Sequence, residues 1–423
     1  MRRTLVLWLV LFAAYAATIG LDAIGASEYA GAEPHHLLMA ESIVEDGDFD
    51  LRNQYAARAY EDFYPGDLRP QGRATEGRLH EPYGIGFAAF IAPAYALGGP
   101  TGVELFLAAV AALAVALAYR LALRVVPDPW ALGAAGAVGL SPPLLASGSA
   151  VYPEAAAGAA LAGAALLAVR LDARPARRDA VVCFALLGAL PWLGIRFAAA
   201  GVLVGFVAAR ALWRARRRTL AVGSVELALF SIALYVGLNE ALFGGPTPYA
   251  ALASGESATG ASFPIGYLER GDRLVALFAD RDAGLLRWAP VLLLAFAGLW
   301  WLWRLHRERL ARAVPQLGEV ELAASVSAGV LGIQLLVAAF LAPELLGGWF
   351  PGRHLLAALP LAIPLVALGL RHAPRVGTVL AALTIAASVW LYADVRWGDG
   401  ELAGQRPNAP LGPLTEILPS FER

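Results

Sequence analysis

Residues 101–124 read TGVELFLAAVAALAVALAYRLALR, an apolar block that ends in two arginines, Arg120 and Arg124. A hydrocarbon core of about 30 Å takes about 20 helical residues to cross, so this block is long enough to span a membrane. Backbone groups inside a bilayer must be satisfied within the segment, and the block lacks the alternation of a barrel strand. The stretch therefore predicts a transmembrane helix whose basic end lies at one membrane surface.

The same pattern recurs along the chain, in which 58% of the residues are hydrophobic and 16% are charged. A soluble protein of this length would need more charged residues to cover its surface. Further apolar blocks lie at about 4–21, 129–148, 154–170, 179–193, 195–213, 219–242, 286–304, 320–342, 353–370 and 374–393. The predicted fold class is all-α, a polytopic transmembrane helical bundle of about 11 spans.

Arginine clusters set the expected orientation, because the chain contains no lysine and its arginines gather at every second turn between the apolar blocks. The positive-inside rule places these turns in the cytoplasm. It also places the N-terminus there, since Arg2 and Arg3 precede the first block, which we interpret as an uncleaved helix and not a signal peptide. We expect a multi-pass protein of the inner or plasma membrane, with its C-terminus outside.

The predicted organisation is a bundle over residues 1–393 followed by a short extracytoplasmic tail, 394–423. Two long loops fall on the outer side. The first, 22–83, carries 13 acidic residues against five arginines and is the candidate catalytic loop; the second is 244–285. The apolar stretch 84–98 is too short to cross a bilayer, so we interpret it as an interfacial or re-entrant helix.

Two carboxylates at the outer side are candidate catalytic groups. Glu33 and Pro34 open a helical pattern, where the positive end of the helix dipole favours an ionised carboxylate that can act as a general base. Glu154 is a lone charge in a nearly uncharged run, and acids at the membrane edge are costly unless they have a function. The alternative for both is a purely structural role at the start of a helix.

Three isolated arginines on the outer halves of helices are candidate ligands for the phosphate of a lipid-borne donor: Arg196, Arg281 and Arg353. A planar guanidinium presents a fork of donors that matches phosphate oxygens. Each of these side chains could instead extend to the membrane interface. Their common placement on one side favours the phosphate site.

Three further residues near these groups are predicted to orient the substrate: His35, His36 and Tyr152. The two histidines could instead simply cover the loop. No metal-ligand spacing supports a metal site. A divalent cation that assists a departing phosphate remains open as an alternative, and no other cofactor is implied.

The segments AEPHHLLMAESIVEDGDFDL, GRLHEPYGIGFAAFIAPAYALGG, SPPLLASGSAVYPE, LPWLGIRF, LFADRDAGLLRWAPV and GWFPGRHLL occur in this order. In their motifs, order and topology the chain resembles the GT-C superfamily of membrane glycosyltransferases, which includes protein O-mannosyltransferases and aminoarabinose transferases. The resemblance implies a sugar transferred from a polyprenyl-phosphate carrier, an outer-loop acid as the base, and inversion at the anomeric carbon. Relatives usually carry Asp-Glu before the proline, whereas this chain has Ala32 and Glu33.

The sequence thus predicts a glycosyltransferase of the cell envelope whose active site faces away from the cytoplasm. Its expected partners are a polyprenyl-phosphate-linked sugar donor, a hydroxyl-bearing acceptor and membrane lipids, with no nucleic acid. Ala32 favours one alternative, a catalytically silent relative that binds lipid or serves as an assembly subunit. A lipid flippase or secondary transporter is the other, although the repeated halves typical of transporters are not visible.

Overall fold

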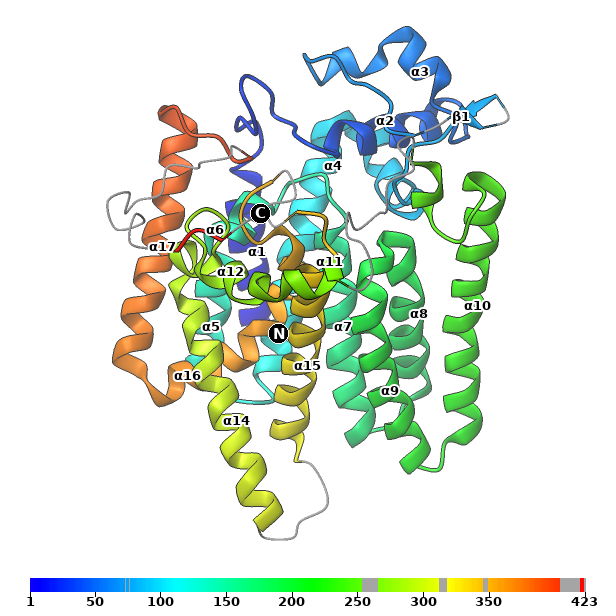
Figure 1. Ribbon diagram of the computed structural model, residues 1–423. Coiled ribbons are helices and arrows are strands. Elements are labelled where there is room, and N and C mark those ends of the chain that lie inside the picture. Colours follow the sequence, from blue (N-terminus) through cyan, green and yellow to red (C-terminus); the bar gives the residue numbers. More distant parts are fainter. Residues whose placement is uncertain are drawn as a thin grey trace.

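The computed structural model describes residues 1–72, 74–75, 77–252, 265–311, 318–344, 349–403 and 419–421, which form a bundle of helices (Figure 1). Its principal helices are α1 (Arg2–Ala16), α4 (Ile85–Ala122), α5 (Trp130–Gly139), α6 (Pro142–Ala146), α7 (Glu154–Ala173), α8 (Arg177–Leu193), α9 (Ala198–Arg214), α10 (Arg218–Phe243), α14 (Leu293–Ala311), α15 (Glu319–Phe340), α16 (Ile363–His372) and α17 (Pro374–Trp397). Each apolar block found in the sequence overlaps at least one of these helices. The predicted all-α bundle is confirmed.

Six helices within the described residues are long and apolar enough to cross a membrane: α4, α7, α9 with the turn before it, α10, α15 and α17. The other blocks form shorter, broken or more charged helices. The block at 129–148 breaks after Gly139 because Pro142 and Pro143 cannot continue the helix and instead begin α6. The block at 353–370 begins with two 3-10 turns before α16.

The burial of the helices separates an interior from a lipid-facing surface. Helix α7 is rich in alanine and lies in the centre of the bundle. Of its apolar membrane-spanning stretch, 83% is buried inside the protein. Small side chains let the neighbouring helices α4, α8 and α9 approach it closely. Helix α10 lies at the edge of the bundle, where only 17% of its apolar stretch is buried. It exposes large apolar side chains such as Leu229, Phe230 and Leu234. These residues suit contact with lipid tails.

Helix α4 consists of two helical segments joined at a kink. Gly98 and Gly99 leave the helical conformation there, Gly99 with a positive φ of 58°, and Pro100 follows. Glycine tolerates this backbone, and proline removes a helical hydrogen bond. The kink separates the apolar stretch 84–98 from the block at 101–124, as the sequence predicts. Whether the first segment lies in the interface stays a prediction.

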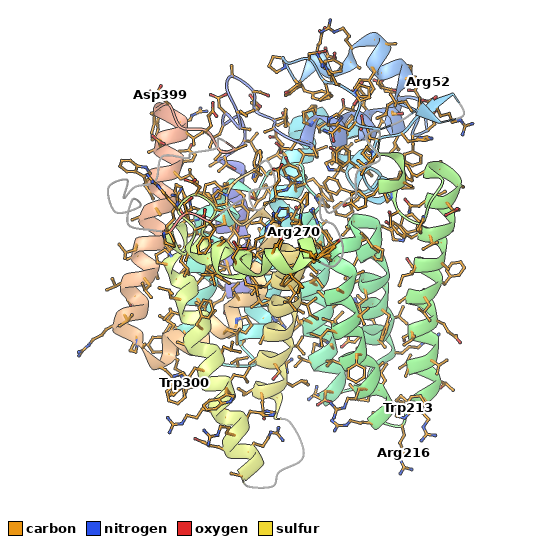
Figure 2. All side chains as sticks on the ribbon, viewed as in Figure 1. Arg52, Trp213, Arg216, Arg270, Trp300 and Asp399 are labelled. Carbon is orange, nitrogen blue, oxygen red and sulfur yellow. The ribbon has the colours of Figure 1, made fainter. Side chains whose placement is uncertain are left out.

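The first long loop folds over one end of the bundle, the α2 end, which is uppermost in Figure 1. It contains α2 (Glu33–Glu45), α3 (Arg52–Ala57) and an antiparallel hairpin of β1 (Ala74–Thr75) with β2 (Arg78–Leu79), and α2 packs against α4. Arg216, in an arginine-rich turn, lies at the opposite end (Figure 2). The long loop and the basic turns therefore lie at opposite ends of the bundle.

The two remaining predicted outer segments are described only in part. Within 244–285 the structure describes the turns η3 (Pro248–Ala251) and η4 (Glu269–Asp272), and the helices α11 (Ile265–Leu268) and α12 (Arg273–Ala279). Residues 253–264 lie outside the described residues, as do 404–418 and 422–423 of the predicted tail. The extracytoplasmic position of both segments stays a prediction.

Candidate active site

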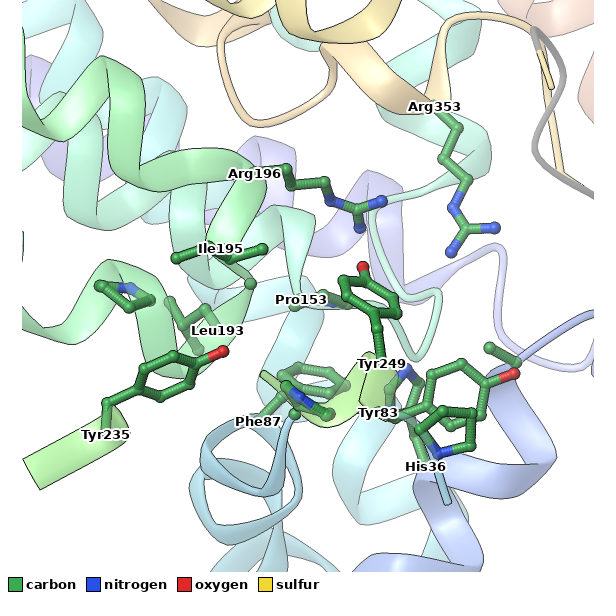
Figure 3. Close-up of a pocket in the computed structure, with 16 residues that line it drawn as sticks. His36, Tyr83, Phe87, Pro153, Leu193, Ile195, Arg196, Tyr235, Tyr249 and Arg353 are labelled. Atoms are coloured by element: carbon green, nitrogen blue, oxygen red, sulfur yellow. The ribbon is translucent and has the colours of Figure 1, made fainter. Parts of the chain in front are cut away.

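A cavity of about 120 Å³ lies beneath the long loop, where α2 and the segments preceding α4, α7 and α9 meet. Figure 3 shows the guanidinium groups of Arg196 and Arg353 on one side of it, and Tyr83 and His36 on the other. Its wall comprises Ala32, His36, Pro82, Tyr83, Gly84, Phe87, Pro153, Pro191, Leu193, Gly194, Ile195, Arg196, Tyr235, Pro248, Tyr249 and Arg353. Three predicted site residues, Arg196, Arg353 and His36, therefore line the same cavity.

Arg353 reaches the cavity from the 3-10 turn η6 (Arg353–Leu355). The preceding Gly352 has a φ of 89°, and a Cβ there would meet Leu285, so this turn requires glycine. The guanidinium carbon lies 3.7 Å from the ring centroid of Tyr152, over the ring, which allows a cation–π interaction. The Tyr152 hydroxyl donates to the Ala30 carbonyl at 2.7 Å, so this ring is fixed from its other end.

Glu154 is the first residue of α7 and is almost fully buried. Its Oε1 accepts hydrogen bonds from Nη2 of Arg196 at 2.7 Å and from Nε of Arg353 at 3.3 Å. The other oxygen, Oε2, is buried without a hydrogen-bond partner. Two guanidinium groups that line the cavity thus share the carboxylate of Glu154. Such a wall suits an anionic group with several acceptor oxygens.

Glu33 is the first residue of α2, and the residue that caps the helix is Ala32. Its two oxygens accept backbone N–H bonds from Ala30 at 2.9 Å and from Val151 at 2.8 Å, and its side chain is buried. Burial outweighs these bonds and raises the pKa of Glu33 to about 8, contrary to the expectation that the helix dipole keeps it ionised. Ala32, and not Glu33, lies on the cavity wall.

His36 lies on the cavity wall, one helix turn after Ala32, among aromatic rings. Its ring centroid lies 4.9 Å from those of Tyr83 and Phe87 and 6.4 Å from that of Tyr152. Burial and the nearby positive charges hold the pKa of its imidazole well below the ordinary value, so the ring is neutral at neutral pH. Its Nδ1 is buried without a hydrogen-bond partner.

His35 belongs to a separate buried network behind the wall. Its Nδ1 lies 2.8 Å from the Tyr55 hydroxyl, which donates to Glu81, and Glu81 also accepts the backbone N–H of Gln71. The Gln71 side chain accepts a hydrogen bond from the Tyr83 hydroxyl at 2.6 Å. The network therefore fixes Tyr83 on the cavity wall. Glu81 and Tyr83 were not predicted, since Glu81 is one of 13 acids in the loop and nothing in its spacing marks it.

Arg281 is not among the residues on the cavity wall. Its side chain is exposed, and its backbone N–H donates to the Pro419 carbonyl at 2.9 Å. The structure thus brings together two of the three predicted arginines. In the part of the chain that the structure describes, no group of three or more His, Cys, Asp or Glu side chains is arranged to hold a metal ion.

A second cavity, which we call the apolar groove, has a volume of about 160 Å³ and lies between α14, α15 and the turns before α16. Its walls are entirely apolar and comprise Phe278, Leu285, Leu292, Ala295, Phe296, Leu299, Ala328, Leu331, Gly332, Leu335, Leu355, Leu359, Ala362 and Leu365. Leu355 and Leu359 lie shortly after Arg353 in the chain. The segment 353–359 therefore contributes both to the charged cavity and to this apolar groove.

Similarity to solved structures extends over nearly the whole chain. The aminoarabinose transferase ArnT from Cupriavidus metallidurans covers 92% of the chain with a TM-score of 0.59 at 15% identity in the apo state. The chain has the GT-C fold. The same ArnT bound to undecaprenyl phosphate gives a TM-score of 0.55 at 15% identity and 92% coverage, and the archaeal oligosaccharyltransferase AglB from Archaeoglobus fulgidus, in complex with an inhibitory peptide and a dolichol-phosphate, gives 0.51 at 12% identity and 95% coverage.

The chain spans 64% of the length of ArnT and 56% of that of AglB. No protein-family model matches the sequence, and a search of curated protein sequences returned no significant match. The similarity to these glycosyltransferases therefore lies in the GT-C fold.

Proposed function

We propose that this protein transfers a sugar from a polyprenyl-phosphate carrier to a hydroxyl-bearing acceptor at the extracytoplasmic face of the membrane. The observation that carries this proposal is the arginine pair on the cavity wall. Arg196 and Arg353 both line the cavity and both bond the carboxylate of Glu154, so two guanidinium groups are fixed where a phosphate can bind. Guanidinium groups bind phosphate oxygens with fixed geometry and do not lose their charge.

The apolar groove beside the same segment supports a lipid-linked donor. A prenyl chain in the groove would pass Leu355 and Leu359, and its phosphate would then lie toward Arg353. The GT-C structures named above add support, since one contains undecaprenyl phosphate and another a dolichol-phosphate.

In the proposed reaction, the acceptor oxygen bonds to the anomeric carbon as the bond from that carbon to the carrier phosphate breaks. The electron pair departs with the phosphate, and Arg196 and Arg353 stabilise the charge that develops there. A single displacement of this kind inverts the anomeric carbon. Glu154 acts as a positioning residue that fixes both guanidinium groups, while Arg281 has no part in the reaction.

The role of Glu33 in this proposal differs from that predicted from the sequence. Because both of its oxygens are bonded to backbone N–H groups, it joins the start of α2 to the loop before α7. It thereby fixes the cavity wall from behind.

The distribution of arginines supports the proposed orientation of the protein in the membrane. The basic turns lie at the opposite end of the bundle from α2, and the positive-inside rule favours the cytoplasmic side for such turns. The cavity beneath α2 would then face the extracytoplasmic side.

Ala32 on the cavity wall favours a second candidate, a catalytically silent protein that binds the lipid carrier. Both candidates predict binding of undecaprenyl phosphate, and they differ only in transfer. The test is to incubate the purified protein in lipid nanodiscs with a panel of labelled undecaprenyl-phosphate hexoses and pentoses, using a bacterial membrane fraction as the source of acceptor.

Release of undecaprenyl phosphate together with label in the acceptor supports the transferase, provided that Arg353→Gln abolishes both and Arg281→Gln leaves both unchanged. Binding of undecaprenyl phosphate without any transfer supports the silent protein. Neither binding nor transfer contradicts both candidates.

A further inference from the structure

The acceptor hydroxyl must lose a proton during transfer, and the cavity wall offers few groups to receive it. Ala32 carries only a methyl group, Glu33 is sealed behind the wall by two backbone bonds, and Glu154 is paired with two arginines. Burial raises the pKa of the Tyr83 hydroxyl, so it stays protonated and cannot accept a proton.

His36 differs from these groups in being both on the wall and unpaired. It is 4% exposed, and in the part of the chain that the structure describes its side chain makes no hydrogen bond. A buried polar group without a partner is rare in proteins, and a catalytic role is one of its explanations. Its Nδ1 is buried, whereas Nε2 makes no hydrogen bond and is not among the fully buried atoms, so Nε2 is the ring nitrogen open to a group in the cavity.

We propose that His36 is the general base of the transfer reaction, accepting the proton of the acceptor hydroxyl at Nε2. The proposal rests on the proposed glycosyltransferase function. As the acceptor oxygen bonds to the anomeric carbon, its O–H bond breaks and the proton passes to Nε2, while the electron pair of the breaking sugar–phosphate bond leaves on the phosphate. The enzyme then holds an imidazolium, which returns its proton to water once the products depart.

The surroundings of His36 suit this cycle. The rings of Tyr83 and Phe87 lie close enough to stabilise the imidazolium by cation–π interaction. The charged and titratable groups around it are Arg353, Arg196, His35, Tyr83 and Tyr152. Burial, together with the positive charges among these groups, lowers the pKa of the imidazole and keeps it neutral. A donor phosphate bound to the two arginines would offset their charge, so the imidazole becomes a better proton acceptor when the donor is present.

The pH dependence of the wild-type protein separates this base from Glu33. Because the pKa of free His36 lies well below 6.5, kcat/KM should fall only in acid, with its limb below pH 6.5. The kcat limb, which reports the donor-bound state, should lie at higher pH than the kcat/KM limb. A limb in kcat/KM near pH 8 would point to Glu33, whose pKa is about 8, and would overturn the proposal.

Variants give the second test, in nanodiscs with labelled undecaprenyl-phosphate sugar. His36→Ala should lower kcat by about 100-fold or more, the usual contribution of a general base, and added imidazole should restore part of it. Binding of undecaprenyl phosphate should persist, which shows that the variant folds. His372→Gln, an exposed histidine at the end of α16, is the matched control and should not change kcat.

A His36→Ala variant that binds the carrier and keeps kcat within about threefold of wild type refutes His36 as the base, since a general base contributes far more. Absence of transfer by the wild-type protein under all conditions is a different result, because it refutes the glycosyltransferase function itself.

Discussion

Nη2 of Arg196 lies 2.7 Å from Oε1 of Glu154, although the two residues are 42 positions apart. Glu154 begins α7, and Arg196 lies in the turn before α9. The same oxygen accepts a hydrogen bond from Arg353, which follows it by 199 positions. One buried carboxylate therefore sets the positions of both guanidinium groups on the cavity wall. The account of donor binding depends on this arrangement.

Replacing Glu154 with Gln should destabilise the protein and disorder the phosphate site. The change leaves two buried like charges without their common partner, and breaking such a pair costs about 3 kcal/mol when one partner is partly exposed. We expect a lower unfolding temperature and a transfer rate at least about tenfold lower, the latter because misplaced guanidinium groups stabilise the leaving phosphate less. Thermal unfolding in detergent and the transfer assay measure the two effects. Unchanged values for both would show that the ion pairs are dispensable.

Arg353→Lys keeps the positive charge but loses the planar fork and the stacking on Tyr152. Binding of undecaprenyl phosphate should weaken by about tenfold, equivalent to about 1.4 kcal/mol. Titration of the variant with undecaprenyl phosphate in nanodiscs provides the measurement. Arg281→Lys, which changes an exposed arginine away from the cavity, is the control and should bind as wild type does.

Ionisation of Glu33 should make the stability of the fold depend on pH. Its pKa is raised from 4.5 to about 8 in the folded protein, so the folded state binds this proton more tightly than the unfolded state. The contribution of Glu33 to the free energy of unfolding should therefore fall as pH rises from about 4.5 to about 8, by at most about 1.4 kcal/mol per pH unit, and level off above that.

Comparison of wild type with Glu33→Gln tests this sign. The amide does not titrate, so unfolding temperatures measured from pH 5 to pH 9 should show the wild type losing stability relative to the variant. A difference that is constant with pH would contradict the raised pKa. Because Glu33 is not the base in this account, Glu33→Gln should also retain measurable transfer.

A bulky side chain in the apolar groove should weaken binding of the long prenyl chain without changing the contacts of the phosphate. Gly332 lines the groove, and a Cβ there would meet no heavy atom within 4 Å, so Gly332→Leu fits the helix and projects a side chain into the open space. We expect binding of undecaprenyl phosphate to weaken by about tenfold, or about 1.4 kcal/mol, while geranyl phosphate binds as before. Gly237→Leu on α10, where a Cβ is equally free, is the control. Equal effects on both lipids would place the prenyl chain elsewhere.

The fold was predictable because its signals are local. Each apolar block carries its own length and hydropathy, and these suffice to predict a helix. The orientation that the arginines indicate stays a prediction. The break after Gly139 and the kink at Gly98 and Gly99 also have local causes in proline and glycine. Pattern alone could not decide which blocks form one continuous helix.

The site was predictable only in part, because its contacts join residues far apart in the sequence. Isolated charges in apolar surroundings marked Glu154, Arg196 and Arg353 correctly as neighbours, since such charges need partners. The same reasoning placed Arg281 with them, but it is absent from the cavity wall. The sealing of Glu33 could not be foreseen, because its partner Val151 is 118 positions away.

The most direct test of the central claim is an experimental structure of the protein in nanodiscs with undecaprenyl phosphate bound. The account predicts density for the phosphate within hydrogen-bond distance of Arg196 and Arg353, with the prenyl chain running past Leu355 and Leu359. Density for the phosphate at the arginine-rich end of the bundle, or in a position that contacts neither arginine, would contradict it.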